Sequence, residues 1–206
     1  MHAETIRRYA EQYVKHINLP FLIYARVDTV TEAKVRMLKA MGCRTFAMGV
    51  ESGSERLRKK ILFRNISNEE IIESFRLVKS FGIRVSAYNM IGFPTETRAE
   101  IFETIAINKK IGADAFSVTI LEPYKGTPIR KMCEDDGLDP AYETTWNKVQ
   151  YVPSGMTSVE LAGLHRTFPL YVRFDPSRYD DIRLAEEDDD AFKKLMAEHL
   201  GLVNPP

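Results

Sequence analysis

The sequence predicts an α/β protein built on a parallel β-sheet, because three features recur along its 206 residues. Short apolar stretches alternate with segments of helical periodicity, the helical segments begin at capping residues, and they end at glycines that the next apolar stretch follows closely. Nearly continuous apolar character, in place of strict alternation, is typical of parallel strands that are covered on both faces. Strands that alternate with helices indicate βαβ units with right-handed crossovers.

Four short apolar stretches are expected to form the strands, and several of them are rich in β-branched or aromatic residues. They are residues 21–25, 45–50, 83–91 and 115–121. A closed eight-stranded barrel typically needs about 250 residues and eight βα units. Four strands therefore predict a partial barrel, a small open sheet or a piece of a larger fold.

Three helices with clear start and stop signals are expected between these strands, and residues 4–16 are expected to form a further helix before the first strand. In a capping box, a Ser or Thr and the Glu three residues later each accept a hydrogen bond from the other's backbone N–H, which fixes where a helix begins. The starts and stops are Thr31 and Gly42, a capping box at 67–70 and Gly82, and a capping box at 97–100 and Gly112.

The regular alternation fades in the last third of the chain. We expect one short helix within residues 126–136, irregular chain over 137–156, and a helix over 158–172 that tolerates Pro169. A final helix is expected over residues 186–200, with its acidic run as a solvated first turn, because the helix macrodipole favours negative charge there.

Composition and charge exclude several classes of protein. Lys plus Arg and Asp plus Glu both number 29, so there is no electrostatic case for binding nucleic acid or an anionic membrane. Two cysteines are too few for a disulfide scaffold, and the four histidines form no metal-binding pair. No apolar run approaches the roughly 18 residues of a membrane span, and no signal core follows the N-terminus. We therefore expect a soluble, cytoplasmic protein.

Candidate binding residues follow the predicted strands, because ligands of parallel α/β folds bind beyond the C-terminal strand ends. Glu51 comes directly after an apolar strand, where a carboxylate needs a partner or a ligand. Arg26 ends the first strand and could face the same ligand or could instead neutralise Glu51. The glycines at the other strand ends, Gly53 and Gly92, could equally serve tight turns, and Cys43 is expected to be a packing residue.

Four motifs lie in register with this organisation. They are GVESGS at 49–54, SNEE at 67–70, MIGFPTET at 90–97 and PYKGTP at 123–128. In this order they resemble the radical S-adenosylmethionine (radical SAM) superfamily, most closely the branch that carries a cobalamin-binding domain. The similarity runs from about residue 21 to residue 128 and continues weakly through the tail, for example at Trp146.

The resemblance implies a partial TIM-like (βα) barrel with parallel strands, of which this chain supplies the last four βα units. It places the barrel in residues 1–136 and an irregular and helical C-terminal extension in residues 137–206. It also implies that Glu51 hydrogen-bonds the ribose or the amino group of S-adenosylmethionine, and that Arg64 pairs with the methionine carboxylate. The other residues expected to bind this cofactor are Arg26, Ser52, Gly53, Tyr88, Asn89, Gly92, Pro94, Leu121 and Pro123.

One departure from the family pattern concerns the cysteines. The family's CxxxCxxC segment, which holds a [4Fe–4S] cluster through three thiolates, does not occur in the sequence. Cys43 and Cys133 are too far apart along the chain to replace it, and the two strands expected before residue 21 have no counterpart. We therefore expect the chain to be the C-terminal portion of a radical SAM enzyme, with the missing N-terminal barrel segment as its partner, and to be unable to cleave S-adenosylmethionine alone. No catalytic or metal-ligating residue is assigned.

Three functions remain open at this point. In the first, the parent enzyme cleaves S-adenosylmethionine reductively to a 5′-deoxyadenosyl radical that abstracts hydrogen from a small-molecule substrate, with cobalamin as a possible further cofactor. In the second, the chain is an inactive half-barrel that serves as a binding or scaffolding module. In the third, it is a phosphate-binding barrel enzyme in which residues 49–54 cradle phosphate at a helix N-terminus, although that loop contains no lysine.

Overall fold

The structure is a computed structural model that describes residues 3–142 and 151–202. The chain divides into two compact units, each taken here as far as the chain is described. The first contains Met1–Glu51, Asn65–Asn89 and Lys110–Ser117, and the second contains Ser52–Arg64, Met90–Lys109 and Val118–Pro206. Trp146, at which the family similarity was expected to continue, lies outside the described residues.

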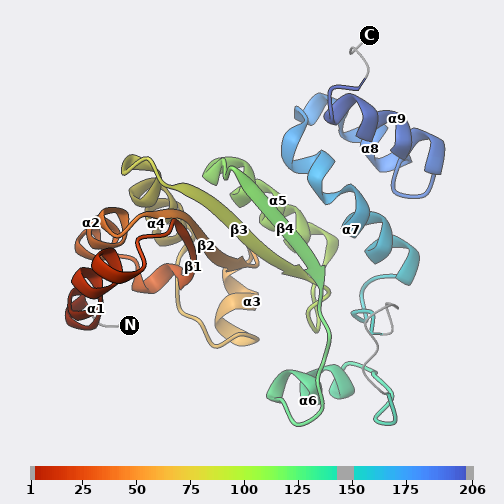
Figure 1. Cartoon of the computed structure of the whole chain (residues 1–206). Coiled ribbons are helices and arrows are strands. Elements are labelled where there is room, and N and C mark those ends of the chain that lie inside the picture. Colours follow the sequence, from red (N-terminus) through yellow and green to blue (C-terminus); the bar gives the residue numbers. More distant parts are fainter. Residues whose placement is uncertain (1–2, 143–150, 203–206) are drawn as a thin grey trace. The chain divides into compact units, whose positions relative to one another are not determined.

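Four strands form one sheet in the order β1-β2-β3-β4 (Figure 1), which confirms the α/β class and the four predicted strands. Strand β2 pairs in parallel with both β1 and β3. It begins two residues earlier than predicted, because Cys43 is buried and pairs with Phe21. The strands are β1 (Phe21–Arg26), β2 (Cys43–Glu51), β3 (Arg84–Ile91) and β4 (Ala115–Ile120).

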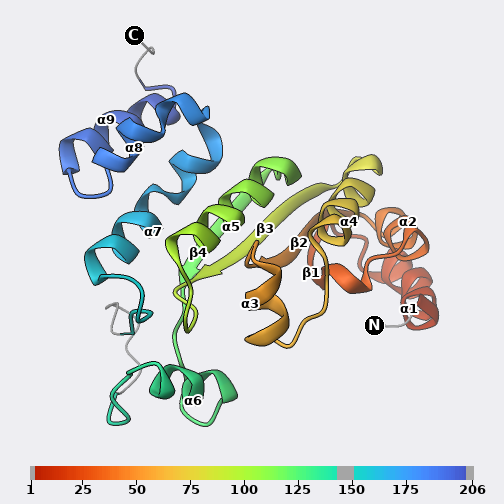
Figure 2. The same ribbon diagram turned by 180° about the vertical axis from the view of Figure 1, so that it is seen from behind.

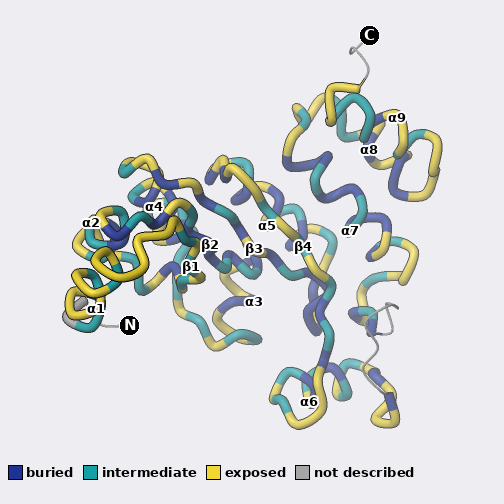
Figure 3. The backbone as a smooth tube through the Cα atoms, in the orientation of Figure 1, coloured by how far each residue is buried: buried dark blue, intermediate teal, exposed yellow. Residues whose placement is uncertain are grey.

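Exposed and less exposed residues alternate along β1, β3 and β4, as the tube in Figure 3 shows. Val85 and Ala87 of β3 are fully buried. In contrast, Tyr88 of the same strand is 37% exposed, and Tyr24 of β1 is 74% exposed. Coverage of both sheet faces was expected from the apolar character of the strands. In the described residues, one side of these strands is instead left open.

Helices of the first unit supply its apolar core. Val35 and Leu38 of α2 are buried, as are the inward residues of α4. Helix α2 begins after Thr31, whose side chain accepts from the backbone N–H of Lys34. The predicted capping box of α4 is present, with both of its hydrogen bonds. These helices are α1 (Ala3–His16), α2 (Glu32–Ala40) and α4 (Asn68–Ser80), and a short 3₁₀ turn, η1 (Val27–Thr29), follows β1.

The second unit is mostly helical and has its own apolar cluster. That cluster joins Leu57 and Phe93 to residues of and after α6, among them Cys133 and Tyr151. None of the described helices is both long and apolar enough to cross a membrane. The helices, seen from both sides in Figures 1 and 2, are α3 (Glu55–Lys60), α5 (Arg98–Ile111), α6 (Pro128–Asp135), α7 (Ser158–Arg173), η2 (Pro176–Arg178), α8 (Tyr179–Leu184) and α9 (Asp189–His199).

Most of the acidic run near the C-terminus forms the exposed helix start that was predicted, and only Glu186 departs from it. Helix α9 begins at Asp189 with Asp188 as its N-cap, whereas Glu186 lies before the helix and is only 8% exposed. Its carboxylate accepts from Arg98 at 2.5 and 2.8 Å and from the Tyr171 hydroxyl at 2.6 Å. A buried carboxylate with these partners is held outside the helix that the charge pattern predicted.

In each of the helices α2, α4 and α5, a lysine near the end donates to a backbone carbonyl at the end of a later helix. Each lysine lies three residues before the glycine at which its own helix stops. The pairs are Lys39 with Gly82 (3.1 Å), Lys79 with Gly112 (2.7 Å) and Lys109 with Phe174 (2.5 Å), the C-cap residue of α7.

Candidate functional site

The C-terminal end of β1 is occupied by Arg26, whose guanidinium binds Asp28. Its Nε and Nη2 atoms donate to the two carboxylate oxygens at 3.0 and 2.7 Å. This hydrogen bond, together with the charge of Asp28, raises the pKa of Arg26. The side chain is 57% exposed. Asp28, rather than the expected Glu51, is thus the carboxylate that the structure pairs with Arg26.

Glu51 ends β2 in a left-handed backbone conformation, with φ at +64°. The pairing of β2 with β3 shifts here, because Gly49 pairs with Tyr88 while Glu51 pairs with the next residue, Asn89. A non-glycine residue in this conformation costs about 1–2 kcal/mol. Backbone strain of this kind is concentrated at binding and active sites, which supports the selection of Glu51 as a candidate.

The carboxylate of Glu51 lies over Gly49. A Cβ atom placed on Gly49 would lie 2.4 Å from Oε1 of Glu51. Gly49 pairs with Arg26 on one side and with Tyr88 on the other, and paired residues of neighbouring strands project to the same side of a sheet. The side chain that glycine lacks therefore leaves a gap between Arg26 and Tyr88, and the Glu51 carboxylate lies in it.

An aromatic pair extends this part of the first unit. The rings of Tyr24 and Tyr88 have their centroids 5.8 Å apart, at an angle of 56°. Their contact raises the pKa of Tyr88. Asn89 lies behind them in the sheet, is only 3% exposed, and donates from Nδ2 to the backbone carbonyl of Ser117 at 3.0 Å. The open side of the first unit thus combines two phenol rings, a guanidinium and a carboxylate.

The residues after Glu51 belong to the second unit and are packed closely against α5. Ser52 is fully buried, and its hydroxyl lies 3.4 Å from that of Thr104. The backbone N–H of Gly53 donates to the Thr104 hydroxyl at 2.8 Å, and that of Ser54 donates to Ser52 at 3.1 Å. These amides are the ones that a phosphate would use at the start of α3, and side chains already bond them. This arrangement counts against the phosphate-cradle alternative.

An ion pair joins α3 to α5, and hydrogen bonds from the same arginine reach the loop between β3 and α5. Arg56 donates to both oxygens of Glu100 at 2.8 Å, and it also donates to the side chain and the carbonyl of Thr95. Burial alone would raise the pKa of Glu100, but hydrogen bonds from Arg56, Ser54 and Thr97 outweigh it and bring that pKa down to about 2. Glu100 and Thr97 also complete the predicted capping box of α5.

The loop after β3 turns sharply and is held by Glu96. Gly92 and Thr95 both have positive φ, at +84° and +61°. One oxygen of Glu96, Oε2, accepts from the backbone N–H groups of Gly92 and Phe93 at 2.5 and 3.0 Å. Pro94, which lies between Gly92 and Thr95, is buried. The turn that was expected to contact S-adenosylmethionine is therefore shaped by a carboxylate inside the protein.

The remaining predicted residues take part in hydrogen bonds of the backbone. Leu121 donates from its N–H to the carbonyl of Ile91 at 2.8 Å, and the carbonyl of Pro123 accepts from Arg130 at 3.4 Å. The N–H of Arg64 donates to the carbonyl of Arg58 at 2.8 Å. No cofactor contact of these residues is visible in the chain alone, and their roles in binding stay predictions.

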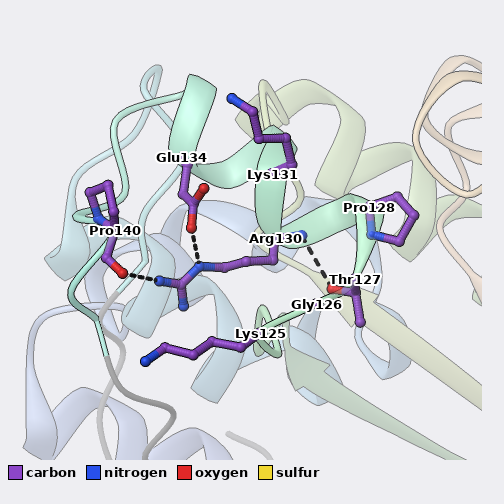
Figure 4. Close-up of a pocket in the computed structure, with 8 residues that line it drawn as sticks. All are labelled: Lys125, Gly126, Thr127, Pro128, Arg130, Lys131, Glu134 and Pro140. Atoms are coloured by element: carbon purple, nitrogen blue, oxygen red, sulfur yellow. Dashed lines mark hydrogen bonds and ion pairs between the residues drawn. The ribbon is translucent and has the colours of Figure 1, made fainter.

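The fourth motif lines an open hollow of about 480 Å³ at the start of α6 (Figure 4). One of the residues that line the hollow, Arg130, is buried, and its guanidinium is bonded to several groups. The guanidinium reaches Glu134 at 2.7 Å and the carbonyl of Pro140 at 3.0 Å, as Figure 4 shows, and it also reaches the carbonyl of Tyr142 at 3.2 Å. Arg130, two residues after the motif, thus ties α6 to the chain that follows it.

The two cysteines do not fit an iron–sulfur cluster. Both Cys43 and Cys133 are buried, and burial raises the pKa of each thiol, that of Cys133 to about 12. A cluster of the family type needs three thiolates, and the sequence contains only these two cysteines. The described residues also contain no group of three or more His, Cys, Asp or Glu side chains placed to hold a metal ion.

Sequence reasoning found Glu51 and the turn at Gly92 but did not single out Arg56, Glu96 or Glu100 as the residues that hold the loops. Glu96 and Glu100 lie within or next to the quoted motif, which was the signal available. No local sequence signal pointed to Arg56, because its partner Glu100 lies 44 residues further along the chain.

Comparison with known proteins identifies relatives for half of the chain. The sequence profile of the Radical SAM superfamily matches residues 3–107. An uncharacterised methyltransferase of Pyrococcus horikoshii is 33% identical over 111 residues, which is 54% of this chain and 24% of that protein. The tRNA-2-methylthio-N(6)-dimethylallyladenosine synthase of Thermotoga petrophila is 30% identical over 105 residues, which is 50% of this chain and 23% of that protein. The chain thus spans about a quarter of the length of these relatives.

Solved structures share the fold at low sequence identity. The radical S-adenosylmethionine methyltransferase TsrM from Kitasatospora setae superposes with a TM-score of 0.58 and 17% identity, over 75% of this chain and 30% of TsrM. The cobalamin-dependent S-adenosylmethionine radical enzyme OxsB gives a TM-score of 0.58 and 14% identity, over 97% of this chain and 40% of OxsB. These neighbours confirm the partial TIM-like barrel that the sequence predicted. With its profile match, its motifs at the strand ends and this fold, the chain belongs to the radical SAM superfamily.

Proposed function

We propose that this chain supplies the S-adenosylmethionine-binding face of a radical SAM barrel, with Glu51 as its central ligand. The observation that carries the proposal is the strained Glu51 at the end of β2, with its carboxylate over the gap at Gly49. A carboxylate at that place accepts hydrogen bonds from ribose hydroxyls or from an ammonium group, both of which S-adenosylmethionine offers.

The residues around Glu51 fit such a ligand. Gly49 provides the room that the Glu51 carboxylate occupies, and Arg26 and Tyr88 flank it in the neighbouring strands. In the second unit, Arg64 would pair with the methionine carboxylate, and the turn at Gly92 would contact the adenosine, as the resemblance implies. The residues of this chain thus bind and orient the cofactor.

The chemistry that S-adenosylmethionine supplies in this superfamily, cleavage to a radical that abstracts hydrogen, needs a cluster whose thiolates this sequence does not contain. Its ligands would have to come from residues outside this sequence. Methyl or methylthio transfer, which the names of two relatives and of TsrM suggest, would be the reaction class of the complete enzyme, with cobalamin as a further cofactor as in TsrM and OxsB.

A second candidate function, a cluster-free binding module, is favoured by the same count of cysteines. A module of this kind would keep the Glu51 site and bind the cofactor or a related nucleoside without cleaving it. The two candidates agree on where the ligand lies, so one binding experiment tests the site that they share.

The experiment measures binding of S-adenosylmethionine to the full 206-residue chain by calorimetry, with a thermal melt of each variant. Glu51→Ala should remove at least one charge-assisted hydrogen bond of about 1.5–3 kcal/mol and weaken binding at least roughly ten- to a hundredfold. Gly49→Ala should also weaken binding, because its methyl group displaces the carboxylate.

The control is Glu11→Ala, which removes an exposed carboxylate of α1 and should leave affinity unchanged. Neither change at the site should lower the melting temperature much, since no apolar packing is lost. Unchanged affinity in Glu51→Ala together with a melt several degrees lower would show that Glu51 is structural. Absence of binding by the unaltered chain would also refute the proposal.

A further inference from the structure

Glu96 is a carboxyl group enclosed in the protein without a cation bonded to it. Its exposure is 0%, and it lies between β3 and α5 in the turn that follows Gly92. Its Oε2 atom accepts two backbone N–H groups, as described above. Its Oε1 atom is buried and has no hydrogen-bond partner among the described residues. A charged carboxylate in this position would be costly, because one of its oxygens has lost its hydrogen bonds to water and has no hydrogen-bond partner in the protein to replace them.

The groups around Glu96 favour its neutral form. Gly92 faces apolar side chains of β4 and α7, since a Cβ there would lie 3.3 Å from Ile120 and 3.4 Å from Leu161. The charged groups that face it are Glu100 of α5 and Arg56 of α3, and the Arg56 guanidinium is already bonded to Glu100 and Thr95. Asp136, after α6, binds the backbone N–H of the adjacent Thr95.

The net effect of these surroundings is to raise the pKa of Glu96. Burial raises the pKa of Glu96 to about 8, and the negative charge of Glu100 adds to the rise. The N–H groups of Phe93 and Gly92 and the charge of Arg56 act against it without cancelling it. The burial of the carboxyl group and its raised pKa therefore both indicate that Glu96 carries a proton at neutral pH.

The turn depends on this side chain for its shape. Two of its residues have positive φ, which the local sequence does not favour at Thr95. The backbone closes only one hydrogen bond inside the turn, from the N–H of Glu96 to the carbonyl of Phe93 at 2.9 Å. The N–H groups of Gly92 and Phe93 would be buried without an acceptor if the Glu96 side chain were removed, at a cost for each.

We propose that Glu96 is a positioning residue that holds the Gly92–Thr95 turn in its binding shape while its carboxyl group is protonated, and that loss of the proton loosens the turn. The effect on cofactor binding rests on the proposed function above. The effect on the turn itself does not, so the two are measured separately.

The first measurement is thermal stability between pH 5 and pH 9 for the full chain and for Glu96→Gln. The folded pKa of Glu96 exceeds that of the unfolded chain, so the folded state binds more protons between about pH 4.5 and pH 8 and stability falls as pH rises through this window. Glutamine keeps the acceptor oxygen and has no proton to lose. The variant should therefore gain stability relative to the unaltered chain as pH rises from 5 to 9.

Two further variants make this result specific. Glu73→Gln is the control, because this exposed carboxylate of α4 pairs with Arg76, which lowers its pKa, and any deficit of the variant should stay constant from pH 5 to pH 9. Glu96→Ala removes both acceptor bonds and should melt lower at every pH. A difference between Glu96→Gln and the unaltered chain that does not change with pH would overturn the proposal, whether or not the alanine variant folds.

The second measurement is the affinity for S-adenosylmethionine at pH 6 and pH 9, compared between the unaltered chain and Glu96→Gln. At pH 9 about a tenth of Glu96 would keep its proton, so the affinity of the unaltered chain should fall about tenfold more than that of the variant. Equal pH profiles would refute the link from Glu96 to binding. No binding by either protein would refute the proposed function, while the melts still decide the role of Glu96.

Discussion

Gly53 shows how one residue fixes the approach of two chain segments. A Cβ atom on Gly53 would lie 2.3 Å from the carbonyl carbon and oxygen of Glu103 and 2.5 Å from the backbone nitrogen of Thr104. All three atoms belong to the backbone of α5, which cannot move aside as a flexible side chain can. The loop after β2 therefore contacts this helix through bare backbone, and the bond from its N–H to Thr104 depends on that contact.

Gly53→Ala is accordingly expected to destabilise the chain by about 3 kcal/mol or more, at the upper end of overpacking costs. Chemical denaturation monitored by circular dichroism measures this. Gly155→Ala is the matched control, because nothing lies within 4 Å of the Cβ position there. It should stay within about 0.5 kcal/mol of the unaltered chain. A small effect at both positions would show that α5 and the loop can separate without cost.

For single residues, the sequence predicted where a side chain lies better than it predicted which group that side chain bonds. Glu51 was selected because a carboxylate follows an apolar strand, and the structure places it at that strand end with a strained backbone. Its expected neutralising partner Arg26 pairs with Asp28 instead, two residues away, because a short-range bidentate contact was available. Glu96 is fully buried in a turn whose Gly92 faces apolar side chains of β4 and α7, and no local sequence pattern could reveal those distant neighbours.

Among the helices, α4 has the most complete start signal. The Ser67 hydroxyl accepts from the N–H of Glu70 at 3.1 Å, and the Glu70 carboxylate accepts from the N–H of Ser67 at 2.7 Å. The backbone N–H of Ser67 lowers the pKa of Glu70 by donating to it. Each side chain satisfies a backbone donor that the helix leaves without a partner.

Ser67→Ala should therefore cost about 1 kcal/mol of stability. Ser80→Ala on the same helix is the control, because its hydroxyl bonds only the carbonyl of Leu77 within the last turn, and it should be close to neutral. The double variant with Glu70→Ala should lose less than the sum of the single changes, since the two bonds form one unit. Strict additivity of the two losses would contradict a reciprocal cap.

Helices with caps and glycine stops were predictable, and so were α6 and most of α9, whereas the six-residue helices were missed and the start of α9 was misplaced. Both predicted capping boxes are present, at Ser67 and at Thr97. Helix α3 has only six residues, too few for a periodic pattern, and it was missed. The start of α9 was placed too early because charge patterning could not show that Arg98 and Tyr171 bind Glu186.

For the whole molecule, alternating strands and helices were sufficient to predict the class and the sheet. All four strands were found near their observed bounds, and the family resemblance is confirmed by the profile and by the shared fold. The division into two compact units was not foreseen, because it runs through β3 and β4 rather than through a linker. Composition shifts and loop residues give no sign of a division of that kind.

The cysteine content leads to a prediction for the intact chain. Anaerobic treatment with iron and sulfide should yield no stoichiometric [4Fe–4S] cluster, because only two thiols exist, both are buried, and burial raises their pKa. Iron analysis and visible absorption measure this. Cys43→Ala and Cys133→Ala should give the same low iron content as the unaltered chain. About four irons per chain, lost on replacing either cysteine, would contradict it.

The lysine contacts at the helix ends have a consequence for how such a chain could have grown. If the alternating units arose by gene duplication, each copy carried both halves of the contact: a lysine that serves the following copy and a carbonyl that serves the preceding one. The third lysine, Lys109, finds its carbonyl at Phe174 of α7, which is not part of a further strand–helix copy. In that case α7 would give the last lysine the carbonyl that a following copy gives to each of the other two.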